Sequence, residues 1–343
     1  MAADERPLVA VLGATGATGR TAAHRLAATG RARLRLGART RSTVAELASE
    51  LEAEARAVDA TNPAELAEFC AGAAVVVQCA GPSLRITPTV LAAALHAGAH
   101  LVDPAGDLDP VPTGGRSVVL GAGVVPGLSG LLPRLLPPRP RRLDVYNGGA
   151  DRLTPAAAAD VLLSTPPRYG LPRAAWRDGR VEPAALVTQP AVVLPGFTGP
   201  MHAAPLLTAE VQRLAAELVA AQARAYSVFP TAALPEALAS AWESGDPLTH
   251  VEAVISAADS DVAAYDAGIT LLASARYDEG GTRRTLLRSA DSLTLTGAFT
   301  ALAVEDVLDG KVPVGVGWAA EVLDPGTVVE RLANDPSVDE LAL

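Results

Sequence analysis

The feature that most constrains the fold is a glycine triplet directly after an apolar run near the start of the chain. Gly13, Gly16 and Gly19 follow the run Leu8–Leu12 at a spacing of three. The apolar run predicts a buried strand, and the alanine-rich stretch after it predicts a helix. Glycines at such a turn allow a sharp reversal and close packing of the helix on the strand. The sequence therefore predicts a strand–turn–helix unit at the start of the chain.

Short apolar runs alternate with alanine- and leucine-rich stretches through the first third of the chain. Further strands are predicted at 32–36, 55–58, 73–78, 100–102 and 117–120, and helices at 17–28, from about 43, from 63 and at 88–97. This alternation predicts an α/β fold in which a doubly wound parallel sheet forms a Rossmann domain over residues 1–127.

The pattern changes after Gly127, and prolines crowd residues 133–140. The rest of the chain predicts helices at 155–163, 208–225, 235–244 and 296–310, and antiparallel strands at 251–257, 266–277 and 282–295. We therefore predict a second, α+β domain over 128–300 on a mixed or antiparallel sheet. A helical segment at 301–343 is expected to pack back on the first domain.

The glycine triplet also predicts a site for the phosphates of a dinucleotide. A missing side chain lets the backbone amides approach a diphosphate, which then lies at the positive end of the helix dipole. The residues expected to line this site are Gly13, Ala14, Thr15, Gly16, Ala17, Thr18 and Gly19. The alternative is a structural glycine-rich turn with no ligand.

The end of the second predicted strand favours NADP(H) over NAD(H). NAD-binding proteins usually place an acidic residue there, whereas this chain has Arg39, Thr40 and Arg41. Arginine can bind a 2′-phosphate through two parallel hydrogen bonds. The alternative for these arginines is a solvated loop. Asp59, after the third strand, either contacts the adenine or caps the following helix.

Composition excludes several classes of partner and site. The net charge is −10 with no cluster of basic and aromatic residues, which argues against nucleic acid and anionic membranes. Two cysteines, Cys70 and Cys79, do not form a disulfide framework, and no spacing suggests a metal site. The first seven residues lack the charge and apolar run of a secretion signal, so we expect a cytoplasmic protein.

Several familiar kinds of chemistry are missing from the sequence. No tyrosine is followed by lysine four residues later, and the only lysine is Lys311, beyond the last long predicted helix. Schiff-base catalysis and a lysine base are therefore not expected. A G-x-S-x-G nucleophile motif is absent as well, which argues against a hydrolase.

Four segments in order resemble the saccharopine dehydrogenase/reductase-like family. Besides the glycine turn, they are "VVVQCAGP" (75–82), "ALHAGAHLVDPAGD" (94–107) and "GAGVVPGLSGLL" (121–132). A weaker likeness continues at 168–181 and 307–325. Two positions depart from the family pattern, with Leu101 where tyrosine is usual and Asp107 where glutamate is usual.

The resemblance implies a Rossmann domain followed by an α+β domain whose sheet builds a homodimer. It also implies the reduction of a C=N bond by NADPH, with a small molecule as substrate. Lysine-pathway relatives carry polar residues and a cysteine where this chain has Gly121, Gly123 and Val124. This difference argues for a smaller or less polar substrate than saccharopine, or for an activated C=C bond.

We place the candidate site residues at strand ends and in loops of both domains. Cys79, Ala80, Gly81 and Pro82 are expected to form the wall beside the nicotinamide. The candidate catalytic residues are Asp103, Tyr146, Tyr169 and His202, and the candidate substrate contacts are Arg168 and Asn147. Each has a structural alternative: Asp103 could cap a turn, Cys79 could be a small packing residue, and His202 could lie in an inert loop.

Three functions are consistent with these features. The first is an NADPH-dependent reductase of an imine in an amino-acid-like substrate, as in specialised metabolism. The second is an enoyl-type reductase of a C=C bond. The third is a non-catalytic NADP-binding sensor or scaffold, which the shortage of evident proton donors favours.

Overall fold

The computed structural model describes residues 5–343, and the chain folds into two units. Residues 1–4, part of the segment interpreted above as lacking a secretion signal, lie outside the described residues. Unit 1 contains the described residues up to Leu128 and also Leu293–Asp324. Unit 2 contains Ser129–Ser292 and Pro325–Leu343. The C-terminal segment, expected as one piece from residue 301, is thus divided between the two units.

Unit 1 is built on a seven-stranded parallel sheet, which confirms the predicted Rossmann architecture. The strand order is β16-β6-β5-β4-β1-β2-β3. The bounds are β1 Leu8–Leu12, β2 Arg33–Ala38, β3 Glu54–Ala57, β4 Val75–Gln78, β5 His100–Val102, β6 Ser117–Leu120 and β16 Gly315–Trp318. The strand order reverses between β1 and β4, and a crevice for a dinucleotide opens at such a point beyond the carboxyl ends of the strands.

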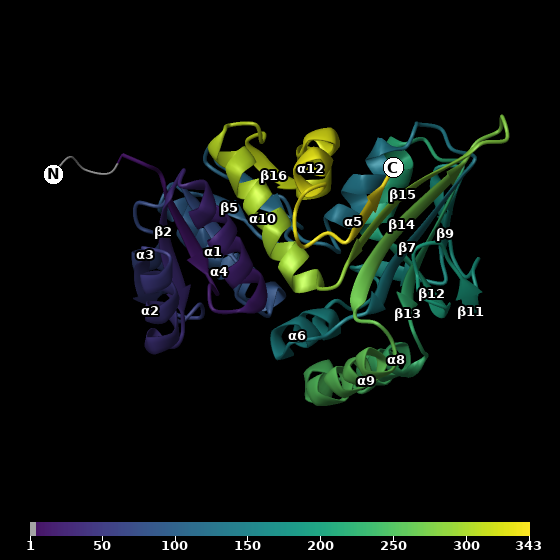
Figure 1. Ribbon diagram of the computed structural model, residues 1–343, viewed down its shortest axis with the longest axis horizontal. Helices are drawn as coiled ribbons and strands as arrows, with labels where there is room; N and C mark the ends of the chain where they lie inside the picture. Colours follow the sequence, from purple (N-terminus) through teal and green to yellow (C-terminus); the bar gives the residue numbers. More distant parts are fainter. Residues whose placement is uncertain (1–4) are drawn as a thin grey trace. The chain divides into compact units, whose positions relative to one another are not determined.

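Helices cover both faces of this sheet. They are α1 Ala17–Thr29, α2 Arg41–Glu50, α3 Pro63–Cys70, α4 Ser83–His96, α10 Ser292–Leu308 and α11 Ala319–Val322. α3 and α4 bury apolar residues against the face that carries Ala10 and Leu12. The long helix α10 runs beside α1 (Figure 1). The start of α3 follows from its sequence, because the Asn62 side chain accepts hydrogen bonds from two first-turn amides and Pro63 occupies the first helical position.

The strand β16 was not predicted from the sequence. It belongs to the segment that returns to unit 1, and it pairs in parallel with β6 along Gly315–Trp318. Two of its four residues are glycines, which are depleted in strands, so the local sequence does not indicate a strand. The pairing brings Trp318 to the carboxyl edge of the sheet, beside Leu120.

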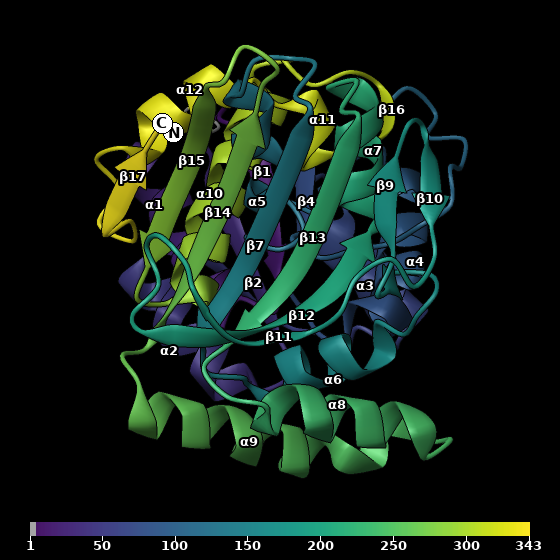
Figure 2. The same ribbon diagram turned by 90° about the vertical axis from the view of Figure 1, so that its right-hand side faces the viewer.

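Unit 2 is built on a mixed sheet of ten strands, which confirms the predicted fold class (Figure 2). The strands are β7 Arg142–Ala150, β8 Gly170–Pro172, β9 Ala175–Arg177, β10 Arg180–Glu182, β11 Gln189–Val193, β12 Pro200–Thr208, β13 Gln222–Phe229, β14 Gly268–Arg276, β15 Thr282–Ser289 and β17 Glu340–Ala342. The central pair β7–β13 is parallel, and the other strand pairs of this sheet are antiparallel.

Unit 2 also contains several helical segments. They are α5 Leu128–Leu131, η1 Leu132–Leu135, α6 Pro155–Leu163, α7 Ala209–Glu217, α8 Ala233–Glu243, η2 Pro247–His250, α9 Val251–Ala264 and α12 Pro325–Leu332. α6, α8 and α9 share a separate apolar cluster around Leu162, Leu238 and Val254. α7 packs on the sheet through Val211 and Leu214. Across residues 5–343, no helix is both long and apolar enough to cross a membrane.

Three elements predicted in unit 2 are corrected by the structure. Residues 251–257 were predicted as a strand but begin α9, whose buried residues Val254, Ala258 and Asp261 recur with helical spacing. The helix predicted at 208–225 ends at Glu217, and its last residues belong to β13. The strand predicted at 282–295 ends at Ser289. In each case an alanine- or leucine-rich run was compatible with either structure.

Candidate functional site

The turn between β1 and α1 is fixed by close backbone contacts at two of its three glycines. Gly13 has a φ of 75°, and the amides of Gly13 and Ala14 both donate to the Gly37 carbonyl, at 2.9 and 3.0 Å. A Cβ at Gly13 would lie 2.6 Å from the carbonyl carbon of Cys79, and a Cβ at Gly19 would lie 2.3 Å from the Gly13 carbonyl oxygen. These two glycines are therefore required by the packing of the protein itself.

Gly16 differs from its two neighbours in the triplet. A Cβ there would meet only the Gly13 carbonyl oxygen, at 3.4 Å, and its φ of −74° and ψ of 162° are open to any residue. Gly16 is the N-cap of α1 and has no side-chain cap, and the first-turn amides of a helix have no intrahelical acceptor. Nothing in the surrounding protein requires glycine here. The open space and the amides fit the diphosphate of a dinucleotide.

The predicted adenosine side of the site lies after β2 and β3. Arg39 and Arg41 are exposed and flank Thr40, the N-cap of α2. Asp59 accepts hydrogen bonds from the amide and the hydroxyl of Thr61, both at 2.8 Å. These bonds, together with the positive charge of Arg39, lower the pKa of Asp59. Asp59 therefore stabilises the turn before α3.

The loop after β4, residues 79–82, is shaped by a buried amide that sequence analysis missed. The Gln78 side chain is fully buried, donates to the Ala80 carbonyl at 2.6 Å and accepts from the Ala80 amide at 3.1 Å. Ala80 also lies close to Gly13, where an added Cβ would come within 2.7 Å of its nitrogen. Gln78 thus holds the expected nicotinamide wall against the phosphate turn. In the sequence, Gln78 is the one polar residue of an otherwise apolar strand, and this could have identified it.

Asp103 follows β5 and is fully buried at the carboxyl edge of the sheet. Its carboxylate accepts hydrogen bonds from the Thr87 hydroxyl at 2.5 Å and from the Ala105 amide at 2.8 Å. Burial raises the pKa of Asp103 to about 6, although these hydrogen bonds favour the ionised form. Asp103 therefore ties α4 to the turn after β5 and is partly protonated near neutral pH.

Cys79 is half-buried next to this carboxylate. Burial and the neighbouring charge of Asp103 both raise the pKa of the Cys79 thiol above its ordinary value. The thiol therefore stays protonated at neutral pH and lacks the thiolate character of a nucleophile.

A second glycine-rich turn follows β6 at residues 121–127. A Cβ at Gly121 would lie 3.0 Å from the ring of Trp318, and a Cβ at Gly123 would lie 2.5 Å from the Pro104 carbonyl oxygen. Gly127 has a φ of 128°, and its Cβ would lie 2.2 Å from the Gly123 carbonyl oxygen. This turn is closed by protein atoms at all three glycines. Trp318 forms part of its surroundings and was missed because β16 was missed.

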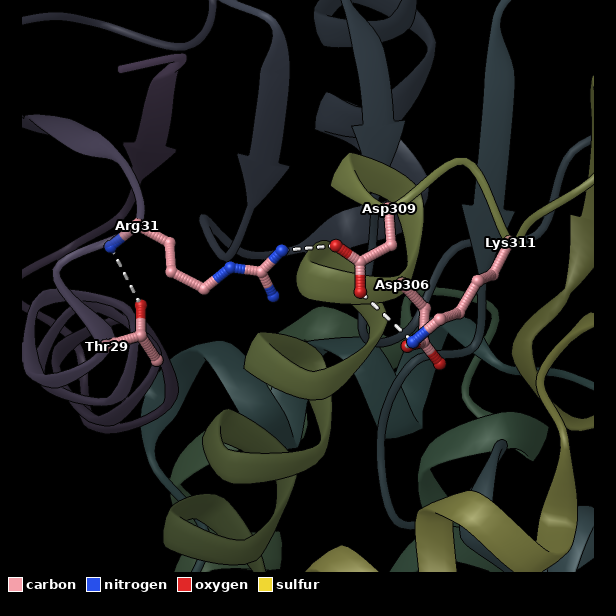
Figure 3. Close-up of polar contacts among 5 residues, drawn as sticks. All are labelled: Thr29, Arg31, Asp306, Asp309 and Lys311. Atoms are coloured by element: carbon pink, nitrogen blue, oxygen red, sulfur yellow. Dashed lines mark hydrogen bonds and ion pairs between the residues drawn. The ribbon is translucent and has the colours of Figure 1, made fainter.

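The single lysine of the chain lies at the amino ends of the strands, whereas these loops lie at the carboxyl ends. Lys311 precedes β16, on the amino side of the strands, and its ammonium group lies 3.0 Å from Asp309 and 3.4 Å from Asp306 (Figure 3). Arg31 also pairs with Asp309. Hydrogen bonds to both carboxylates raise the pKa of Lys311. Lys311 is therefore a charged structural residue.

In unit 2, the structure places Tyr146 and Asn147 on opposite faces of the sheet, because successive strand residues alternate. Tyr146 is buried and stacks on Tyr226 with ring centroids 4.9 Å apart. Asn147 lies beside Ser227 on the other face. His202 was expected in a loop but lies in β12, on the same face as Asn147 by strand register. Tyr146 thus lies on the opposite face of the sheet from Asn147 and His202.

The remaining candidates of unit 2, Arg168 and Tyr169, lie in the turn before β8. Arg168 is exposed and Tyr169 is half-buried. The Tyr169 carbonyl accepts a hydrogen bond from the Ala209 amide at the start of α7, at 3.4 Å. Asp103 belongs to unit 1, whereas the other catalytic and substrate candidates belong to unit 2.

Comparisons with known proteins bear on both units. Residues 9–125 match the family model described as the saccharopine dehydrogenase NADP binding domain. The structure resembles apo saccharopine dehydrogenase (L-Glu forming) from Saccharomyces cerevisiae with a TM-score of 0.67 and 15% identity, covering 98% of this chain and 99% of that chain. At this identity the likeness concerns the fold. None of the curated proteins compared with the chain matches it.

Two further solved structures match with lower TM-scores. GenD2 from gentamicin A biosynthesis, in complex with NAD, has a TM-score of 0.48 and 15% identity, covering 96% of this chain and 93% of that chain. The nucleoside-diphosphate-sugar epimerase PA4631 from Pseudomonas aeruginosa is 33% identical over 28% of this chain and 32% of that chain, with a TM-score of 0.25.

The family match covers the glycine turn, the loop after β4, Asp103 and most of the second glycine turn, and it supports NADP(H) as the cofactor. The structural match extends over both units. Residues 9–125 therefore correspond to the NADP-binding domain of the saccharopine dehydrogenase family, and the fold resembles that of saccharopine dehydrogenase over both units.

Proposed function

We propose that the protein is an NADPH-dependent reductase of a C=N bond in a small, amino-acid-like substrate. The observation that carries the proposal is the open space at Gly16 within a turn whose other glycines are fixed by packing. The NADP-binding family model over the same residues supports it. The change from the polar family residues to Gly121, Gly123 and Val124 favours a substrate smaller or less polar than saccharopine.

The chain offers a distinct group for each part of the cofactor. The amides at the start of α1 would bind the diphosphate, and Arg39 and Arg41 would bind the 2′-phosphate. The loop 79–82, held by Gln78, would line the nicotinamide half. Bound NADPH supplies the hydride.

The reaction also needs a proton. The hydride goes to the imine carbon, a proton goes to the nitrogen, and the products are an amine and NADP+. Among the candidates, Asp103, Tyr169 and His202 carry groups that can release a proton, whereas Tyr146 is enclosed in its stack with Tyr226. The variants D103N, Y169F and H202N would identify the donor, because its loss abolishes the matching limb of the pH–rate profile.

The first experiment is a fluorescence titration of the purified protein with NADPH and NADH. We expect NADPH to bind at micromolar concentrations and more tightly than NADH. Failure of both to bind below millimolar concentration, or tighter binding of NADH, would refute the cofactor assignment.

The second experiment separates the three functions. Pairs of 2-oxo acids and amines, and separately α,β-unsaturated carbonyl compounds, are incubated with deuterated NADPH, and the products are analysed by mass spectrometry. An imine reductase places deuterium on the carbon bonded to nitrogen, while an enoyl-type reductase places it on the carbon β to a carbonyl. NADPH binding without consumption across the panel would favour a non-catalytic sensor or scaffold.

A homodimer and a cytoplasmic location stay predictions from the sequence and the family resemblance. Light scattering on the purified protein tests the first, since a monomer has a mass of 34.9 kDa. Fractionation of the native host cells tests the second.

A further inference from the structure

The helix α10 packs tightly against the first turns of α1. A Cβ at Gly297 would lie 2.5 Å from the Thr18 carbonyl oxygen, 2.6 Å from the Thr21 Cβ and 3.1 Å from the Ala22 nitrogen. Two of these three neighbours are backbone atoms, which cannot move aside as the end of a flexible side chain can. Gly297 therefore sets how closely α10 approaches the helix that follows the phosphate turn.

The same stretch of α10 binds the second glycine turn. Thr300 is fully buried, and its hydroxyl lies 2.8 Å from both the Ala122 and the Thr296 carbonyl oxygens, between which it shares its single proton. One turn earlier, the Thr296 hydroxyl oxygen accepts from the Val124 amide at 3.3 Å. Two of these hydrogen bonds go to backbone atoms of the loop after β6. α10 therefore fixes the course of that loop.

These contacts connect the diphosphate position at the centre of the expected dinucleotide site with its nicotinamide end. The diphosphate lies at the start of α1, and the two mononucleotide halves extend to either side of the crevice. With Arg39 and Arg41 on the β2 side, the nicotinamide half extends toward β4, β5 and β6. The loop 121–127 lies at the carboxyl end of β6.

We infer that Thr296, Gly297 and Thr300 are positioning residues that set the distance between the phosphate turn and the loop after β6, and so place the nicotinamide half of the cofactor. The inference rests on the proposed function. A helix suits this role because its backbone is rigid. About one turn of α10 separates Gly297, which contacts α1, from Thr300, which contacts Ala122. Nothing in this role requires contact with the cofactor.

The test compares NADPH with 2′-phospho-ADP-ribose, which lacks the nicotinamide, by isothermal titration calorimetry. In T300V the Ala122 carbonyl loses its buried donor at nearly unchanged side-chain volume. We expect the Kd of NADPH to rise at least about fivefold and the Kd of 2′-phospho-ADP-ribose to stay unchanged. T300S keeps the hydroxyl and should restore NADPH binding.

G297A should behave differently, because it displaces α1 itself. We expect both ligands to lose affinity, by about tenfold or more. T285V is the matched control: Thr285 is also buried, but it lies on β15 of unit 2, and neither affinity should change.

A merely structural role for α10 would change the thermal stability of T300V but not the ratio of the two affinities. An unchanged ratio in T300V, or no rescue by T300S, would overturn the inference. Should T300V fail to fold, T296V and T296S give the same comparison at a half-buried position. If the wild-type protein binds neither ligand, the proposed function fails, whereas an unchanged ratio with intact wild-type binding refutes the inference alone.

Discussion

The two glycine-rich turns of unit 1 look alike in sequence but differ in what surrounds them. Each follows a parallel strand and begins with a glycine at positive φ, 75° at Gly13 and 63° at Gly121. In the second turn, protein atoms occupy the space beside every glycine. In the first turn, the space beside Gly16 is open.

The difference shows that a glycine has two separate reasons to be present. Where a Cβ would strike backbone, as at Gly127, the glycine is needed for folding. Where a Cβ would meet largely open space beside the first amides of a helix, as at Gly16, packing does not explain the glycine, and we propose that a ligand does. The distances from an added Cβ to the neighbouring atoms tell these two reasons apart, whereas the spacing of the glycines in the sequence does not.

The largest effect is expected for G127A in the closed turn. The alanine would have a strained φ of 128° and a Cβ 2.2 Å from the Gly123 carbonyl oxygen. We expect the free energy of unfolding to fall by about 3 kcal/mol or more. Urea denaturation followed by circular dichroism measures this, and a loss below about 1 kcal/mol would show that the turn is not closed.

A pH-dependent effect is expected next to the closed turn, where the Asp103 carbonyl accepts from the Ala122 amide at 2.9 Å. The pKa of Asp103 is raised from 3.8 to about 6, so folding favours its protonated form. The protonated Asp103 therefore contributes fully to the stability of the fold below about pH 4, and this contribution is lost as the pH rises through 6. Between about pH 4 and pH 7, the free energy of unfolding of the wild type should fall by up to roughly 3 kcal/mol relative to that of D103N.

The measurement is urea denaturation of the wild type and D103N across this pH range. The difference between the two proteins isolates Asp103 from the other titrating groups. Parallel stability curves would contradict the raised pKa.

In the open turn, G16A should separate binding from stability. Its backbone angles suit alanine, so the free energy of unfolding should change by less than about 1 kcal/mol. The added Cβ would lie where the diphosphate approaches, and we expect the Kd of NADPH to rise at least about tenfold. G281A, in a hairpin turn of unit 2 with open space around it, is the control and should change neither quantity.

The smallest effects are expected for R39A and R41A, beyond the open turn. Each would remove the charge-assisted hydrogen bond to the 2′-phosphate that we propose for it, and we expect the Kd of NADPH to rise about fivefold per substitution. The Kd of NADH should not change. R283A, at an exposed position on β15, is the control. An equal loss for both nucleotides would place these arginines away from the 2′-phosphate.

The parts of the structure that depend on local sequence were predicted well. The strand Leu8–Leu12 and the helix Pro155–Leu163 were predicted with the bounds that the structure shows. In both, the pattern of apolar residues and the residues at the ends agree on one structure. The same agreement identified the glycine turn.

The parts that depend on distant pairing were not predictable. β16 forms because β6 offers it an edge, and its own residues carry no strand pattern. Trp318 and the contacts of α10 with Ala122 and Val124 follow from the same return of the chain. Tyr146 and Asn147 were proposed together, but a strand turns neighbouring side chains to opposite faces, so only one of them can share a face with His202.

The insertion of Ser129–Ser292 of unit 2 within unit 1 has a consequence for biosynthesis. When the ribosome has made the first 128 residues, six strands of the parallel sheet are present, but β6 has a bare edge and α1 lacks its neighbour α10. Both are supplied only after Ser129–Ser292, the larger part of unit 2, has been made. The coenzyme-binding unit therefore cannot complete its sheet and helix packing until Leu293–Asp324 has been made, and a truncated product that stops before residue 293 would be prone to edge-to-edge association.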